Sequence, residues 1–210
     1  MSSVDKIYGI GIVGCGMIGD KRAKALGVGG RLVACADIDI TRAEHIAKGS
    51  DAKVFFDWHK LIELPEVDIV NIATLHNSLA EITLAAINAG KHVLVEKPAA
   101  RSATELELVI AAAVRNGVKV HVGFNHRYHR ALRKAKNIID SGELGELMFI
   151  RARYGHGARI GYDKEWRANP MLSGGGELID QGLARSAACD HIVGLRFFYR
   201  VEQPFPDGKR

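Results

Sequence analysis

A glycine-rich loop near the start of the chain has the residue types and the spacing to hold a phosphate group. It reads Gly14-x-Gly16-x-x-Gly19 and directly follows an apolar stretch at residues 7–13. Gly14 permits a tight turn, Gly16 lets the backbone approach a pyrophosphate, and Gly19 lets the next helix pack against the strand. That helix would direct its unpaired N–H groups at the phosphates. The predicted cofactor contacts of the loop are Gly14, Gly16, Met17, Ile18 and Gly19.

An aspartate completes this pattern. A second apolar stretch, residues 31–36, ends on Asp37. A carboxylate at that place accepts hydrogen bonds from both hydroxyls of the adenine ribose and repels a 2′-phosphate, so we expect NAD rather than NADP. The alternative is an aspartate that caps a helix beside a glycine-rich turn.

A lysine is the first candidate for chemistry on a substrate. Lys97 lies between Glu96 and Pro98, after the apolar stretch 92–95. Ligands of open α/β folds bind at the carboxyl ends of the strands, where this lysine is expected. Its ammonium can stabilise the alkoxide that develops as hydride leaves carbon, and Pro98 holds Lys97 in an extended conformation. The alternative is a surface lysine in a strand-to-helix turn.

Composition narrows the class of protein. The chain has 210 residues, of which 47% are hydrophobic and 25% charged, as in a soluble globular protein. Its apolar stretches fall short of the roughly 20 residues that cross a membrane, and no signal peptide is expected. Three cysteines without ligand spacing indicate free thiols in a reducing compartment and no metal site. We therefore expect a cytoplasmic protein without a membrane partner.

The net charge of +5 raises the question of nucleic acid. The densest basic stretch, residues 126–136, continues along an apparent helix that also carries apolar residues at helical spacing. Such a pattern is typical of a solvated helix face, so no nucleic-acid partner is expected.

Strand-like and helix-like segments alternate after the loop, which predicts an α/β fold with a doubly wound parallel sheet. Strands are expected at 67–73, 92–95 and 118–122, with six strands by about residue 123. Capping boxes predict helix starts, and glycines predict helix ends. The predicted starts are Thr41–Glu44, Ser78–Glu81 and Ser102–Glu105, and the ends are Gly49, Gly90 and Gly117. The sequence therefore predicts a Rossmann-type domain at residues 1–125.

A second domain is predicted to follow at residues 126–210. A helix is expected at 130–140 and a long strand at 146–154, whose residues have high β-propensity. The composition predicts an α+β domain.

Five motifs together resemble the Gfo/Idh/MocA oxidoreductases, the relatives of glucose–fructose oxidoreductase and inositol dehydrogenase. They are Gly14–Gly19, Ile72–Thr74, Ala89–Pro98, Val122–Arg127 and Gly174–Gly182. The resemblance covers about residues 5 to 182. It implies hydride exchange between NAD(H) or NADP(H) and a secondary hydroxyl of a sugar or cyclitol.

The resemblance also assigns residues. Lys97 would polarise the reacting oxygen, and Asp180 would orient a histidine base and bind substrate. The base should stand at residue 184, where this chain has Ala184; a general base typically contributes about 10²- to 10⁴-fold to the rate. Further cofactor residues implied are Ala73, Thr74, His76, Glu96, Lys97 and Asn125, and substrate residues are Arg127, Trp166 and Arg167.

Other positions depart from the family pattern. The Thr-Pro-Asn-like turn is Thr74-Leu75-His76 here, and Leu79 stands where a histidine is expected. Both departures flank the cofactor, so altered cofactor affinity is expected. Trp166 has an alternative role as an anchor of a domain interface.

The sequence of residues 183–210 diverges from the family, whose chains continue into a large antiparallel sheet. We expect a truncated second domain, through a frameshift, another truncating lesion or a naturally short chain. Family members are homo-oligomers, and this state is doubtful for a truncated chain. The predicted function is an NAD(P)-dependent oxidoreductase acting on a polyol or sugar, impaired by truncation. The alternative is a non-catalytic dinucleotide-binding protein.

Overall fold

The computed structural model describes residues 6–151, 160–176, 178–182, 184 and 187–189. The chain divides into two compact units. The first comprises residues 1–124 and 156–183, and the second residues 125–155 and 184–210. The predicted boundary between residues 125 and 126 stays a prediction.

The centre of the first unit is a six-stranded parallel sheet in the order β3-β2-β1-β4-β5-β6. This order confirms the predicted Rossmann-type doubly wound fold. Val13 at the end of β1 pairs with Ala36 of β2 and with Ile72 of β4, so the loops after these strands begin at one edge. The strands are β1 (Tyr8–Val13), β2 (Gly30–Ala36), β3 (Lys53–Phe55), β4 (Ile69–Ile72), β5 (His92–Val95) and β6 (Val120–Val122).

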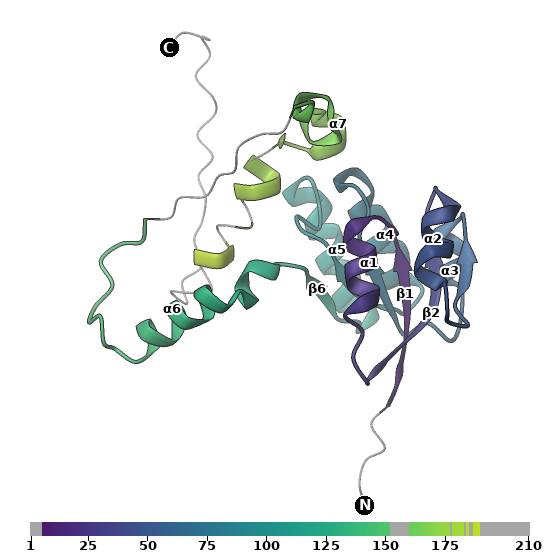
Figure 1. Ribbon diagram of the computed structural model, residues 1–210, viewed down its shortest axis with the longest axis horizontal. Coiled ribbons are helices and arrows are strands. Elements are labelled where there is room, and N and C mark those ends of the chain that lie inside the picture. The colour runs from purple at the N-terminus through teal and green to yellow at the C-terminus, as the bar shows by residue number, and fades with distance from the viewer. Residues whose placement is uncertain (1–5, 152–159, 177, 183, 185–186, 190–210) are drawn as a thin grey trace, which may run out of the picture. The chain divides into compact units, whose positions relative to one another are not determined.

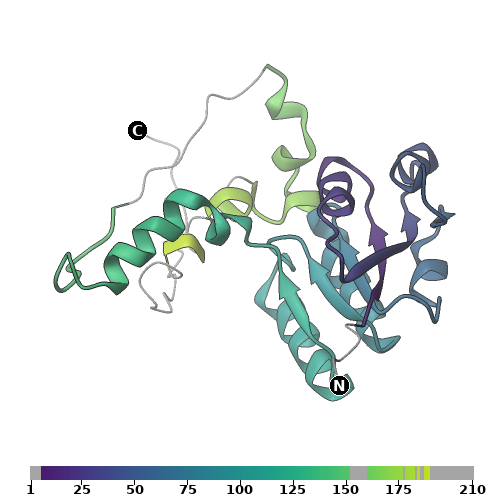
Figure 2. The ribbon, with the colours of Figure 1, turned by 60° about the horizontal axis from the view of Figure 1, so that its bottom comes forward.

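Helices cover both faces of this sheet (Figure 1, Figure 2). One apolar core joins strand residues to α2, and the other joins them to α3, α4 and α5. Ile12 and Ile72 are fully buried, one in each core. The helices are α1 (Met17–Lys24), α2 (Ile40–Ala47), α3 (Trp58–Ile62), α4 (His76–Asn88) and α5 (Ala103–Asn116).

One of the three predicted capping boxes forms. Ser102 caps α5 and accepts a hydrogen bond from the backbone N–H of Glu105 at 3.2 Å. In a capping box the glutamate accepts from the backbone N–H of the capping residue, here Ser102. In this structure the Glu105 carboxylate accepts instead from the N–H of the preceding residue, Arg101, at 2.8 Å. The helix ends at Gly117, whose φ of 64° is the left-handed conformation expected there.

The other two predicted starts are wrong. Asp39 caps α2 and accepts from the N–H of Thr41, so Thr41 lies inside the helix. The helix α4 begins at His76, and the Ser78 hydroxyl in its first turn donates to the Thr74 hydroxyl at 2.9 Å. In both cases the residue expected to cap the helix lies inside it, because the helix begins one or two residues earlier.

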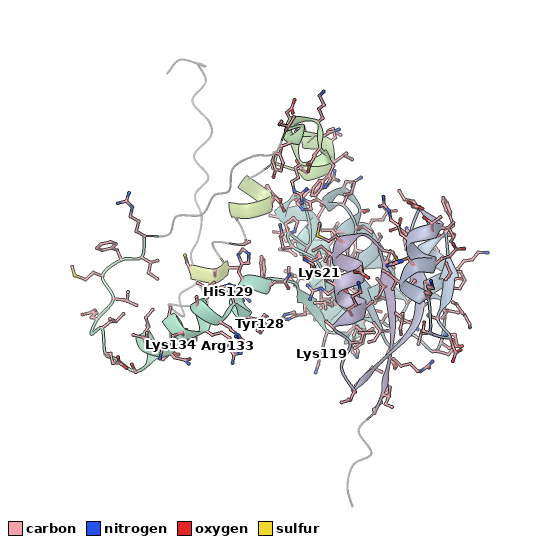
Figure 3. All side chains as sticks on the ribbon, in the orientation of Figure 1. Lys21, Lys119, Tyr128, His129, Arg133 and Lys134 are labelled. Atoms are coloured by element: carbon pink, nitrogen blue, oxygen red, sulfur yellow. The ribbon has the colours of Figure 1, made fainter. Side chains whose placement is uncertain are left out.

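The second unit contains η1 (Asn125–Tyr128) and α6 (Arg130–Asp140), so the helix predicted at 130–140 is confirmed. Figure 3 labels Tyr128, His129, Arg133 and Lys134 along these two elements. Arg133 and Lys134 are exposed, as expected for a solvated helix face.

The strand predicted at 146–154 is wrong where the structure describes it. Residues 146–151 have no regular secondary structure, and residues 152–154 lie outside the described part. Met148 and Phe149 are 91% and 79% exposed. A strand requires a hydrogen-bonding neighbour, and within residues 125–151 no strand is present to pair with this segment.

The remaining described elements belong to the first unit. They are η2 (Tyr162–Lys164), η3 (Trp166–Ala168), α7 (Pro170–Ser173) and the π-helical turn η4 (Leu178–Gly182). Within the described part of the chain, no helix is long and apolar enough to cross a membrane. Of the divergent segment 183–210, only residues 184 and 187–189 are described.

Candidate functional site

The glycine-rich loop adopts a conformation that demands glycine at two positions. Gly14 has a φ of +88°, and a Cβ there would lie 2.6 Å from the carbonyl carbon of Ala73. A Cβ on Gly19, in the first turn of α1, would lie 2.0 Å from the carbonyl oxygen of Gly14. Gly16 precedes α1 as its N-cap, and a Cβ there would meet no atom within 4 Å. The loop is therefore packed on its inner side and open at Gly16.

We expect the substitution Gly19→Ala to displace the loop from α1. The added methyl group collides with a backbone oxygen that has no rotamer to move into, and overpacking of this kind costs about 1–3 kcal/mol. Urea denaturation and a calorimetric titration with NAD measure the two consequences, lower stability and weaker binding. Gly27→Ala is the control, because a Cβ at Gly27 meets nothing within 4 Å. Equal behaviour of the two variants would contradict the prediction.

Asp37 is held in place by the backbone around the loop. Its Oδ2 accepts from the N–H of Cys15 at 2.6 Å, and its Oδ1 accepts from the N–H of Asp39 at 2.8 Å. Each carboxylate oxygen retains a second lone pair, so the carboxylate can still accept from a ribose diol.

A cavity of about 410 Å³ opens beside this carboxylate. Among the predicted cofactor residues, it brings together Gly14, Gly16, Asp37, Ala73 and Thr74. It does not include Met17, Ile18 or Gly19 in its lining, and Met17 is 72% exposed. Open space at Gly16, a fixed carboxylate and a cavity at the carboxyl ends of the strands fit the adenosine and phosphate portions of a dinucleotide.

Sequence reasoning missed several residues of this lining. Phe56 and Trp58 follow β3, a strand of three residues that was not assigned a position. Once β3 is placed beside β2, its carboxyl end must reach the same edge as Asp37, which is the signal that would have found them. The other missed residues include Ile38, Arg42, Asn77 and Ser78.

A second group of polar side chains surrounds Asp180, in η4. Lys97, two residues after the end of β5, donates from Nζ to the Asp180 carboxylate and, at 2.7 Å, to its backbone carbonyl oxygen. Arg167 donates from Nε to the other carboxylate oxygen at 2.8 Å. Burial of Asp180 to 1% exposure raises the pKa of its carboxyl, but the hydrogen bonds from Lys97 and Arg167 outweigh burial and hold that pKa below its usual range. The carboxylate is therefore ionised at neutral pH.

His76 belongs to this group rather than to the dinucleotide cavity. Its imidazole is 4% exposed, with Nδ1 at 3.0 Å from the carbonyl oxygen of Ser173. Its Nε2 is 3.8 Å from Oδ1 of Asp180. Trp166 packs edge-on against the imidazole, with ring centroids 4.6 Å apart, and the Arg167 guanidinium lies 4.5 Å from the Trp166 ring centre. Burial lowers the pKa of His76.

The remaining predicted site residues are placed as follows. Glu96 is buried and forms an ion pair with Arg22 of α1. Arg127 belongs to the second unit, where its Nε donates to the carbonyl oxygen of Ala187 at 3.3 Å. Asn125, in η1, and the buried Ala184 belong to the same unit. The described site of the first unit therefore consists of Lys97, Asp180 and the side chains around them.

A parallel sheet in this strand order, with a glycine loop and an aspartate at its carboxyl edge, defines an NAD-binding Rossmann protein. The family model described as "Oxidoreductase family, NAD-binding Rossmann fold" matches residues 8–124, and the GFO/IDH/MocA C-terminal domain matches residues 132–192. The chain belongs to the GFO/IDH/MocA family of oxidoreductases.

Individual relatives agree with this assignment. The inositol 2-dehydrogenase of Salmonella paratyphi B is 38% identical over 150 residues, which are 69% of this chain and 45% of that protein. A crystal structure of an oxidoreductase domain protein from Kribbella flavida matches with a TM-score of 0.81 and 29% identity, over 91% of this chain and 53% of that one. An NAD binding oxidoreductase from Klebsiella pneumoniae matches with a TM-score of 0.73 and 31% identity, over 89% and 53%. The chain spans about half the length of the relatives it matches.

Proposed function

We propose that the protein is an NAD-dependent oxidoreductase that exchanges hydride with a secondary hydroxyl of a cyclitol or sugar. The observation that carries this proposal is the cluster of Lys97 and Asp180 in the same unit as the dinucleotide cavity. A partly exposed ammonium paired with a buried carboxylate, after a strand of the cofactor-binding sheet, suits an alcohol that must lose a proton and a hydride.

The cofactor would be held by the residues that line the cavity. Gly14 and Gly16 permit approach of the diphosphate, and Asp37 accepts from the ribose hydroxyls. When bound, the nicotinamide ring accepts or supplies the hydride.

Lys97 and Asp180 have complementary roles toward the substrate. The ammonium of Lys97 can donate to the reacting oxygen while it remains bonded to Asp180, because it has three N–H groups. Its positive charge stabilises the negative charge that develops on that oxygen. Asp180 holds both Lys97 and Arg167 in position, so the two donors keep their directions without reorganisation during the reaction.

The identity of the relatives supports a polyol as the substrate class. Several relatives are named inositol 2-dehydrogenase, at 38% and 35% identity for two of them. A cyclitol presents several neighbouring hydroxyls, which Lys97, Arg167 and Asp180 can bind as donors and acceptor. We place the reaction in the cytoplasm, as expected for a protein with reduced cysteines.

A non-catalytic dinucleotide-binding protein is the second candidate. The observation in its favour is Ala184, a methyl side chain at the position where the family resemblance implies a histidine base. Such a protein would bind NAD with Lys97 as a structural residue only.

Calorimetric titration with NAD and a turnover assay with myo-inositol, followed by NADH absorbance, test the proposal. We expect saturable NAD binding and NADH formation that requires the polyol. Binding without turnover of inositol or other polyols would favour the non-catalytic candidate. A folded chain that binds neither NAD nor NADH would contradict both.

We expect Asp37→Asn to weaken NAD binding by about 10- to 100-fold, because a hydrogen bond to a charged group contributes about 1.5–3 kcal/mol. The preference for NAD over NADP should fall with it, since the repulsion of a 2′-phosphate is removed and Arg42 lines the same cavity. Titrations with both cofactors measure the change. Asp51→Asn is the control of equal charge change, because Asp51 is exposed and does not line the cavity. An unchanged NAD-to-NADP ratio in Asp37→Asn would contradict the assignment.

A further inference from the structure

Of the described residues of the first unit, His76 is the histidine that lies beside Asp180. It is the first residue of α4, directly after the loop that follows β4, and its side chain is buried. The groups that face it come from four elements or loops: Lys97 after β5, Trp166 and Arg167 of η3, Ser173 of α7 and Asp180 of η4.

The contact with Ser173 fixes the position of the imidazole hydrogen. A backbone carbonyl oxygen only accepts hydrogen bonds, so Nδ1 of His76, at 3.0 Å from the oxygen of Ser173, must carry the hydrogen. In the neutral imidazole, Nε2 then has a free lone pair.

The charges around the imidazole favour its neutral form. Lys97 and Arg167 already place two cations on the single carboxylate of Asp180. A third cation in the same buried cluster is unfavourable, in agreement with the lowered pKa of His76 that burial causes.

The Nε2 atom lies close to the carboxylate that binds Lys97. Nε2 and Oδ1 of Asp180 are 3.8 Å apart, and in the neutral imidazole both atoms are acceptors, so they share no hydrogen. The ammonium of Lys97 donates to the same Oδ1. A proton acceptor and a cationic donor therefore lie near the same carboxylate oxygen.

We infer that His76, through Nε2, is the proton acceptor of the reaction in place of a side chain at residue 184. The inference rests on the proposed function. In the oxidation, the substrate O–H bond breaks and its proton passes to Nε2. The oxygen electron pair forms the C=O bond, and the electrons of the C–H bond leave with hydride for the nicotinamide. The imidazolium formed is stabilised by Asp180, and in the reduction His76 returns the proton.

The test uses His76→Gln, which keeps an N–H for the carbonyl of Ser173 but cannot accept a proton at neutral pH. We expect turnover to fall about 100- to 10,000-fold, the usual contribution of a general base, with unchanged NAD affinity. His45→Gln, at an exposed position of α2, is the matched control and should behave as the wild type.

The pH profile separates a base from a structural residue. A base acts in its unprotonated form, so kcat/KM of the wild type should fall as the pH drops through the pKa of His76, below the ordinary histidine value. This acidic decline should vanish in the residual activity of His76→Gln.

Nitrogen NMR of the 15N-histidine-labelled full chain supplies a readout that needs no turnover. The resonances of His76, assigned by their loss in His76→Gln, should show a hydrogen on Nδ1 and none on Nε2 at neutral pH. A hydrogen on Nε2 would overturn the inference whether or not the chain turns over. Wild-type turnover that His76→Gln retains would overturn it and leave the proposed function intact. If the tautomer is as expected but the wild type shows no turnover, the proposed function is overturned, and the inference about His76 falls with it.

Discussion

Lys97→Met is expected to lower turnover of a polyol by about 100- to 1,000-fold, the typical loss when one donor to a developing oxyanion is removed. Methionine preserves the length and apolar stem of lysine but has no N–H. The dinucleotide cavity does not include Lys97 in its lining, so NAD affinity should stay unchanged. Steady-state kinetics with saturating NAD and calorimetric titration measure the two quantities separately.

The controls for this prediction distinguish lost chemistry from lost structure. Lys60→Met, at an exposed position of α3, removes the same charge without touching Asp180. Lys97→Arg keeps the charge and a hydrogen bond to Asp180 but changes the direction of the donors, so it should recover stability more than turnover. Equal turnover in Lys97→Met and the wild type would remove Lys97 from the mechanism.

The parts of the fold that local chemistry decides could be predicted from the sequence. The tight turn at Gly14 and the helix end at Gly117 each depend on residues within a few positions, and the structure has the positive φ expected at both. The capping boxes at Thr41 and Ser78 failed for a local reason as well. Asp39, two residues before Thr41, is the N-cap of α2, and α4 begins at His76, before Ser78.

The strand order and the cluster around Asp180 depend on contacts between distant residues. Lys97 and Asp180 are 83 positions apart, and His76 and Ser173 are 97 apart. No spacing rule connects such pairs, so Asp180 came from the family resemblance alone. The family resemblance implied that His76 contacts the cofactor, but its side chain is buried against Trp166 and Ser173, beside Asp180.

Asp180→Asn is expected to lower the free energy of unfolding by about 3 kcal/mol at pH 7. Removal of one partner from a buried ion pair costs about 3–5 kcal/mol. The lower end of this range applies because the side chains of Lys97 and Arg167 are 23% and 29% exposed. Water can therefore solvate part of the charge that Asp180 no longer neutralises. Urea denaturation measures the difference. Asp163→Asn, at an exposed position of η2, is the control of equal charge change and should unfold like the wild type.

The effect of Asp180→Asn should depend on pH with a defined sign. The folded-state pKa of Asp180 lies below its unfolded value, so the unfolded chain binds the proton more tightly. The stabilisation by the carboxylate is therefore complete above the unfolded pKa and is lost as the pH falls through the folded pKa. The stability difference between the wild type and Asp180→Asn should accordingly shrink in acid. A difference that grows as the pH falls would mean that burial dominates, and that Lys97 and Arg167 do not hold an ionised carboxylate between them.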